Sequence, residues 1–300
     1  MTMRLLSALL GSLLLASALA DTETRTPYAE SAIATIESNV VFGHKDGLAM
    51  TLDVYRPVES ANGAALLFLV SGGWRSSWSP PERSLPFFAP FLEAGYAVFR
   101  VRHGSSPRYG IPDAYSDVTR AVRFVRSRAD EFGVDPDRLA AMGNSAGGHL
   151  ALLLGTRGDD GGAPDEGLER TPSRVAAVIA LVPPTDLTIA VWESPESLPS
   201  YRQFPALDLP MERAAEFSPL EHVTPDDAPS LIIMGGADEL VPVFHGERIA
   251  SAFDRENVPH DLIIFPEAGH NLGDWQRVHD ESIRWLNTHL AATTDPSSLQ

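Results

Sequence analysis

The chain has 300 residues, of which 44% are hydrophobic and 21% charged, and this balance fits one large globular domain and argues against a disordered chain. A formal net charge of −17 would repel nucleic acid and anionic membranes, so neither is expected as a partner. The sequence contains no cysteine, which excludes disulfides, thiolate metal sites and a cysteine-linked lipid anchor.

The first 20 residues differ in character from the rest of the chain. Arg4 precedes an apolar run at 5–15, and Ala18-Leu19-Ala20 has the small-residue pattern of a cleavage site. We therefore predict a signal peptide over residues 1–20 and a mature domain over 21–300, secreted or periplasmic and free of the membrane. An uncleaved anchor is the alternative, disfavoured because the apolar run is short for a bilayer span.

From about residue 51 onward, short apolar runs alternate with segments of helical period. This alternation is typical of β–α–β crossover units and a mostly parallel sheet. The run at 64–70 is apolar throughout, as in strands that are buried on both faces. The predicted strands are 51–55, 64–70, 96–102, 138–142, 175–181, 230–234 and 261–265.

Two helices are predicted to lie against this sheet. The first runs from Asp113, placed to cap its start, to Gly133, placed to end it. The second has apolar residues at helical spacing from Trp275 to Leu290, and residues after about 292 are expected to form a frayed tail.

Two connecting segments depart from this plan. Residues 186–218 are rich in proline and glutamate and are more than a plain crossover needs, which predicts a small cap insertion over the mouth of the site. The loop at 156–171 carries several carboxylates that could bind calcium. It lacks the regular oxygen spacing of a calcium loop, so we favour a solvated acidic loop and predict no metal.

A candidate nucleophile lies in Gly143-Asn144-Ser145-Ala146-Gly147, which matches the G-x-S-x-G pattern of a serine on a sharp strand-to-helix turn. Glycines on either side leave room where the backbone is crowded. A predicted strand precedes Ser145 and a helix-forming run follows it, so the positive end of a helix should favour negative charge there. An ordinary glycine-rich turn is the alternative, and this context disfavours it.

A serine hydroxyl needs a base within hydrogen-bond reach and a third group that orients the base. His270 follows the predicted strand 261–265 at the carboxyl edge of the sheet, where open α/β sheets build their sites. Asp238 follows the strand 230–234 at the same edge. Glu239 is a rival carboxylate, but the Leu-Val-Pro continuation favours Asp238. The sequence thus predicts a Ser145, Asp238, His270 triad.

The tetrahedral intermediate of acyl transfer needs two backbone N–H donors for its oxyanion. Ala146, directly after the serine, is the first expected donor. Gly72 and Gly73, a glycine pair at the end of the strand 64–70, are expected to supply the second. The alternative is that this pair only permits a turn.

These motifs resemble the α/β-hydrolase family, in particular its branch of carboxylesterases and feruloyl and acetylxylan-type esterases, related to prolyl-oligopeptidase catalytic domains. The resemblance covers about residues 41–290. It implies a mostly parallel sheet of about eight strands with helices on both faces, and the triad order fits that fold. Relatives usually carry histidine at Ser71 and a tyrosine-arginine pair at Val101-Arg102. The oxyanion donors are backbone groups, so the change at Ser71 should spare catalysis and weaken only the transfer of substrate class.

The expected activity is hydrolysis of carboxylic esters through an acyl-enzyme, without a cofactor. Small-molecule or carbohydrate esters are the expected substrates, with acetyl or feruloyl esters as the sharper version. Trp74, Trp78 and Trp192 are candidates to stack a sugar or aromatic acyl group, with packing as the alternative. His103 and His149 are treated as supporting residues. A serine peptidase of prolyl-oligopeptidase type and a non-catalytic binding protein on the same fold are the rival functions.

Overall fold

The computed structural model describes residues 28–161, 167–192 and 204–292, with only the backbone described at 28–30 and 190–192. The predicted signal peptide and the predicted C-terminal tail lie outside these residues, so both stay predictions. Within the described residues, no helix is both long and apolar enough to cross a membrane.

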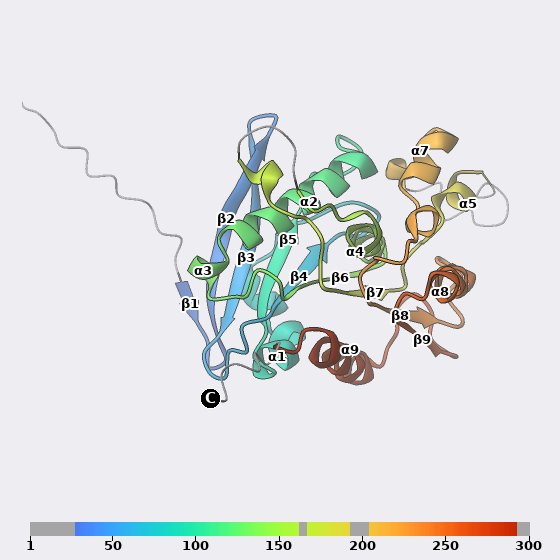
Figure 1. Ribbon diagram of the computed structural model, residues 1–300. Helices are drawn as coiled ribbons and strands as arrows, with labels where there is room; N and C mark the ends of the chain where they lie inside the picture. The colour runs from blue at the N-terminus through green and yellow to red at the C-terminus, as the bar shows by residue number, and fades with distance from the viewer. Residues whose placement is uncertain (1–27, 162–166, 193–203, 293–300) are drawn as a thin grey trace, which may run out of the picture.

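Nine strands of the described chain form one sheet in the order β1-β2-β3-β5-β4-β6-β7-β8-β9 (Figure 1). The strands are β1 Tyr28–Glu30, β2 Ala34–Lys45, β3 Leu48–Pro57, β4 Ala65–Val70, β5 Ala97–Arg102, β6 Leu139–Asn144, β7 Ala177–Leu181, β8 Ser230–Gly235 and β9 His260–Phe265. Pairing is antiparallel from β1 to β3 and between β3 and β5, and parallel from β5 through β4 to β9. The predicted mostly parallel α/β-hydrolase sheet is confirmed.

The sequence reasoning missed the first two strands. β2 is a long strand whose register against β3 shifts twice, between Glu37 and Val40 and between Val41 and Gly43. These irregularities interrupt the alternation of buried and exposed side chains on which strand prediction depends. The sheet therefore begins well before residue 51.

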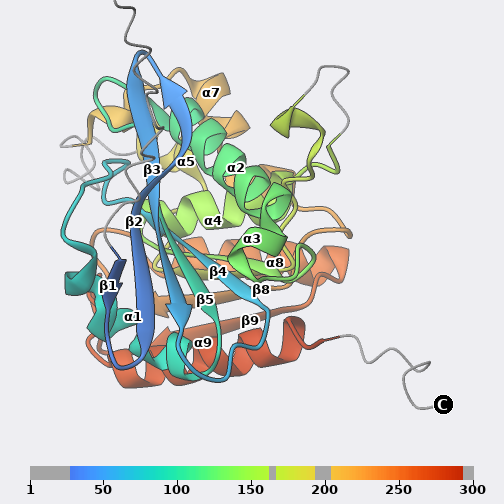
Figure 2. The same cartoon turned by 90° about the vertical axis from the view of Figure 1, so that its left-hand side faces the viewer.

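Helices cover both faces of the sheet (Figures 1 and 2). The helices are α1 Leu85–Glu93, α2 Ile111–Ser127, α3 Ala129–Phe132, α4 Ala146–Arg157, α5 Leu187–Trp192, α7 Met211–Glu216, α8 Phe244–Glu256 and α9 Trp275–His289. One apolar core joins the sheet to α1 and α9, and a second joins its other face to α2, α4 and α8. Because both faces are covered, the central strands are buried throughout.

The helix predicted from Asp113 to Gly133 is two helices, and its cap is not Asp113. Helix α2 begins after Gly110, and the Asp113 carboxylate accepts the Gly110 N–H from inside the first turn at 3.1 Å. Arg128 then leaves helical geometry with φ −120°, which separates α2 from α3. Gly133, at φ 69°, does end α3, as a left-handed residue should.

The acidic loop is held by arginines as far as it is described. The Arg123 guanidinium donates to both oxygens of Asp159, at 3.0 and 2.8 Å, and Arg174 donates to Asp160 at 2.6 Å. Asp165 and Glu166 lie outside the described residues. In the described part of the chain, no group of three or more His, Cys, Asp or Glu side chains is arranged to hold a metal.

Candidate active site

Ser145 lies on a sharp turn between β6 and α4, as the motif predicts. Its backbone adopts φ 56° and ψ −120°, a region that a non-glycine residue adopts only under constraint. The constraint comes from the sheet and the helix together. The Ser145 N–H donates to Leu181 O at the end of β7 at 2.7 Å, and Ser145 O accepts the His149 N–H at 2.9 Å.

The flanking glycines are required by contacts between backbone segments. A Cβ on Gly143 would lie 2.2 Å from the carbonyl carbon of Gly147, and a Cβ on Gly147 would lie 2.5 Å from Leu69 O on β4. These neighbours are main-chain atoms of buried elements, so they cannot move aside. The helix that carries Ser145 therefore packs against the sheet at a distance that only glycine permits.

Ser145, His270 and Asp238 form one hydrogen-bonded chain. The Ser145 Oγ lies 2.9 Å from His270 Nε2, and His270 Nδ1 lies 2.8 Å from Asp238 Oδ2. The three residues follow the carboxyl ends of β6, β9 and β8. A carboxylate only accepts hydrogen bonds, so Nδ1 carries the imidazole hydrogen and Nε2 is left to accept the serine proton.

The orientation of Asp238 is fixed by its own loop. Its Oδ1 accepts the N–H groups of Leu240 and Val241, each at 2.8 Å, and its side chain is fully buried. Oδ2 is thereby aimed at His270, whose side chain is 26% exposed. The rival carboxylate Glu239 is exposed to solvent. The structure thus brings Asp238 to the histidine, as the Leu-Val-Pro continuation indicated.

The glycine pair after β4 forms a tight turn that leaves one of its two N–H groups unused by the turn. Gly72 N–H donates to Arg75 O and Arg75 N–H donates to Gly72 O, both at 3.0 Å. The prediction that Gly72 stabilises an oxyanion finds no support in this geometry. Gly73, at φ 56°, remains as the candidate donor from the turn. Ala146, the first residue of α4, has no acceptor for its N–H within the helix.

Of the two roles that the sequence left open for Trp74, substrate stacking and packing, the structure favours packing. The Trp74 side chain lies in the turn after Gly73, and the residue is only 4% exposed. Its indole N–H donates to His149 Nδ1 at 3.2 Å. Trp192 lies at a position whose side chain is outside the description, so its predicted role stays untested.

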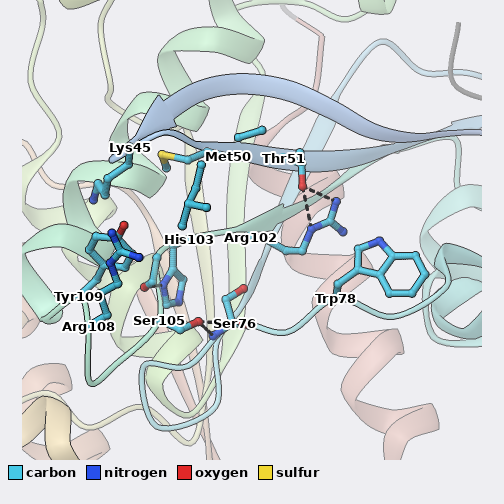
Figure 3. A pocket seen from close by; sticks show the side chains of 13 residues that line it. Lys45, Met50, Thr51, Ser76, Trp78, Arg102, His103, Ser105, Arg108 and Tyr109 are labelled. Carbon is cyan, nitrogen blue, oxygen red and sulfur yellow. Dashed lines mark hydrogen bonds between the residues drawn. The ribbon is translucent and has the colours of Figure 1, made fainter. Parts of the chain in front are cut away.

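Trp78 remains exposed, at 59%, and lines a separate pocket of about 410 Å³ (Figure 3). Its indole N–H donates to Asn39 Oδ1 at 3.1 Å. The pocket lies between β2, β3 and the segments that follow β4 and β5, and His103 is part of its lining. Ser145, Asp238 and His270 do not line it.

The segment 186–218 contacts the site, although its residues 193–203 lie outside the description. Its two ends are tied together, because Leu187 N–H donates to Ser218 Oγ at 2.8 Å. Phe204 packs on the glycine turn so closely that a Cβ on Gly73 would lie 2.5 Å from the Phe204 ring. Apart from the unusual composition of the segment, nothing in the sequence indicates this contact.

Comparison with known proteins places this site in a family. Residues 52–253 match the family model BD-FAE. The chain belongs to the BD-FAE family. This result confirms the predicted resemblance to the esterase branch of the α/β-hydrolases.

Proteins that this chain resembles carry esterase names. This chain is 31% identical over 205 residues to a probable carboxylic ester hydrolase, LipM, of Mycobacterium tuberculosis. The match covers 66% of this chain and 47% of LipM. The chain thus spans about half the length of this relative.

Two solved structures share its fold. A truncated carbohydrate esterase from gut microbiota superimposes with a TM-score of 0.74 at 25% identity, covering 88% of this chain and 99% of that one. A thermophilic esterase of Thermogutta terrifontis gives 0.68 at 27%, covering 86% and 94%. The described domain therefore shares the fold of these esterases.

Proposed function

We propose that the protein is a serine hydrolase that cleaves carboxylic esters through an acyl-enzyme on Ser145. The hydrogen-bonded chain from Ser145 Oγ through His270 to Asp238 carries this proposal, because it supplies a nucleophile, a base and an orienting carboxylate in the required order. A non-catalytic binding protein would have no need for this arrangement or for the constrained backbone of Ser145.

The reaction follows from the positions of these atoms. Ser145 Oγ attacks the ester carbonyl carbon as its proton passes to His270 Nε2, and the Asp238 carboxylate stabilises the imidazolium that forms. The carbonyl oxygen becomes an oxyanion that the Gly73 and Ala146 N–H groups stabilise. The C–O bond then breaks and His270 returns the proton to the leaving alcohol. Water next attacks the acyl carbon as its proton passes to His270 Nε2. The bond from Ser145 Oγ to the acyl carbon then breaks, the acid is released and His270 returns the proton to Ser145 Oγ.

Carbohydrate esters in an exported setting are the substrates that we propose. The signal-peptide pattern at 1–20 and the similarity to a carbohydrate esterase from gut microbiota support this choice. Acetyl and feruloyl groups are the first acyl candidates.

The test is hydrolysis of short p-nitrophenyl esters, acetylated xylo-oligosaccharides and methyl ferulate, with fluorophosphonate labelling alongside. Ser145→Ala should lose on the order of 10⁴-fold or more in kcat/KM and all labelling. Ser251→Ala is a matched control, since Ser251 is exposed on α8. A folded wild-type protein that neither turns over an ester nor labels would refute the proposal, and activity on simple esters alone would refute only the carbohydrate assignment.

A further inference from the structure

The turn that carries Gly73 holds a bulky residue in an unfavourable backbone conformation. Gly73 and Trp74 are its two central residues, and both have φ 56°. Glycine adopts this left-handed region freely, whereas a tryptophan does so only where the surroundings hold it. The direction of the Gly73 N–H therefore depends on contacts that keep Trp74 in place.

The Trp74 backbone carbonyl accepts the Ser106 N–H at 3.1 Å, and a hydrogen bond to His149 holds the Trp74 side chain. The indole N–H donates to His149 Nδ1 at 3.2 Å, and the two rings meet edge to face with their centroids 5.4 Å apart. Trp74 is 4% exposed and His149 is fully buried, so water cannot replace the bond. An indole N–H left without a partner there would carry the full cost of desolvation.

The other nitrogen of His149 fixes the ring in the form that this bond needs. His149 Nε2 lies 2.7 Å from Phe217 O, and a carbonyl only accepts, so Nε2 carries the hydrogen and Nδ1 is free to accept from Trp74. Burial lowers the pKa of His149 to about 4, which keeps the ring neutral near pH 7. Phe217 belongs to the end of the segment 186–218, whose Phe204 packs on Gly73.

His149 also lies on the helix that carries the nucleophile. It stands one turn after Ser145 on α4, and its own N–H donates to Ser145 O at 2.9 Å. In addition, Gly147 N–H donates to Ser71 O at 3.2 Å, just before the glycine turn. The turn, the nucleophile helix and the end of segment 186–218 are thus joined through one imidazole.

We propose that Trp74 and His149 are positioning residues that hold the Gly73 N–H where the oxyanion forms. The inference rests on the proposed function, since it assigns Gly73 as an oxyanion donor for attack by Ser145. Neither side chain touches the reacting atoms. Their effect reaches the substrate through the turn, whose geometry relative to Ser145 they set.

The expected kinetic signature follows from when the oxyanion exists. Negative charge on the carbonyl oxygen develops only after attack, so a misplaced Gly73 N–H lowers kcat and leaves KM nearly unchanged. Loss of a whole oxyanion donor costs about 10²- to 10³-fold, and a displacement of about 1 Å costs about 10²-fold. Loss of the supporting bond should therefore lower kcat by about 10- to 100-fold.

Trp74→Phe is the first test, because it removes the N–H and keeps an aromatic ring. We expect kcat on p-nitrophenyl acetate to fall about 10- to 100-fold with KM within about threefold, and the affinity for a trifluoromethyl ketone, which forms a tetrahedral adduct, to fall by a similar factor. Trp285→Phe is the matched control: Trp285 is also 4% exposed, its indole nitrogen has no hydrogen-bond partner in the described residues, and it lies on α9. Its kcat should stay within about twofold of wild type.

Two substitutions at His149 separate positioning from general stability. Asparagine places an amide oxygen near the site of Nδ1 and can still accept from Trp74, whereas glutamine reaches the site of Nε2, retains a donor for Phe217 O and leaves the indole unpaired. Because the bond to Trp74 is the one of the two that reaches the turn directly, we expect His149→Asn to retain about tenfold more kcat than His149→Gln.

The outcomes distinguish this inference from the proposed function. If wild type hydrolyses esters and Ser145→Ala does not, but Trp74→Phe loses no more kcat than Trp285→Phe, the positioning role is overturned and the triad stands. Equal losses in His149→Asn and His149→Gln would also overturn it. If Ser145→Ala keeps full activity, the proposed function itself fails.

Discussion

His270 and His149 lie beside the same nucleophile, and their surroundings give them opposite properties. The His270 side chain is 26% exposed and lies between a carboxylate and a hydroxyl, 2.8 Å from Asp238 Oδ2 and 2.9 Å from Ser145 Oγ. His149 is fully buried between an indole N–H and a carbonyl, and burial lowers its pKa to about 4.

His270 and His149 differ in the features that suit a histidine to act as a base. In the proposed reaction, the Asp238 carboxylate stabilises the positive charge that His270 acquires when it takes a proton, and partial exposure limits the cost of that charge. No carboxylate of the described residues hydrogen-bonds to His149, so protonation would place a charge in a dry interior and break the bond that it accepts from Trp74. The surroundings of His270 suit proton transfer, and those of His149 suit a structural role.

Removing the imidazole of His270 should cause the largest loss of activity. In His270→Ala, Ser145 has no base, and kcat should fall on the order of 10⁵- to 10⁶-fold, far beyond the loss expected for His149→Gln. Steady-state hydrolysis of p-nitrophenyl acetate measures both variants. Comparable losses in the two would contradict the assignment of His270 as the base.

Asp238→Asn should produce the next largest effect. The amide can no longer stabilise the imidazolium or fix the Nδ1–H tautomer, so kcat should fall on the order of 10⁴-fold. Glu239→Gln is the matched control, since Glu239 is adjacent in sequence and exposed, and its kcat should stay within about twofold. A larger loss in the Glu239 variant than in the Asp238 variant would reverse the choice between the two carboxylates.

The smallest expected effect is on stability in mild acid. The folded pKa of His149 lies below the unfolded value of about 6.5, so its neutral form stabilises the fold fully above pH 6.5, and this contribution is lost as pH falls toward 4. The slope is about 1.4 kcal/mol per pH unit for each such histidine. Burial lowers the pKa of His245 to about 4 as well.

Urea unfolding of wild type and His149→Gln at pH 7, 6 and 5 isolates the share of His149. Burial raises the pKa of Asp227 to about 6, which opposes the histidines below that pH, but this contribution is common to both proteins and cancels in the difference. The wild type should lose more free energy of unfolding between pH 6 and 5 than His149→Gln does. Equal slopes would show that His149 is not neutral in the folded state.

Most strands were predicted from local patterns in the sequence, whereas β2 and the break between α2 and α3 were not. Most strands from β4 to β8 were predicted because they are short apolar runs that are largely buried. The edge strand β9 was predicted from its apolar residues, although most of them are only partly buried. β2 escaped because two register shifts break its alternation. Arg128 interrupts a continuous helical pattern through its φ of −120°, which no periodicity reports.

The sequence by itself determined the places of Ser145, Asp238 and His270, because each follows a predictable strand and the carboxyl ends of neighbouring parallel strands meet at one edge. It also determined the need for glycine at the elbow, a local crowding of backbone. Two facts became visible only in three dimensions: the Gly72 N–H is taken up by Arg75 O, and Trp74 contacts His149. The first is a local turn, but it depends on the left-handed φ of Gly73 and Trp74. The second joins residues 75 positions apart, and spacing along the chain carries no record of which distant atoms come within hydrogen-bond distance.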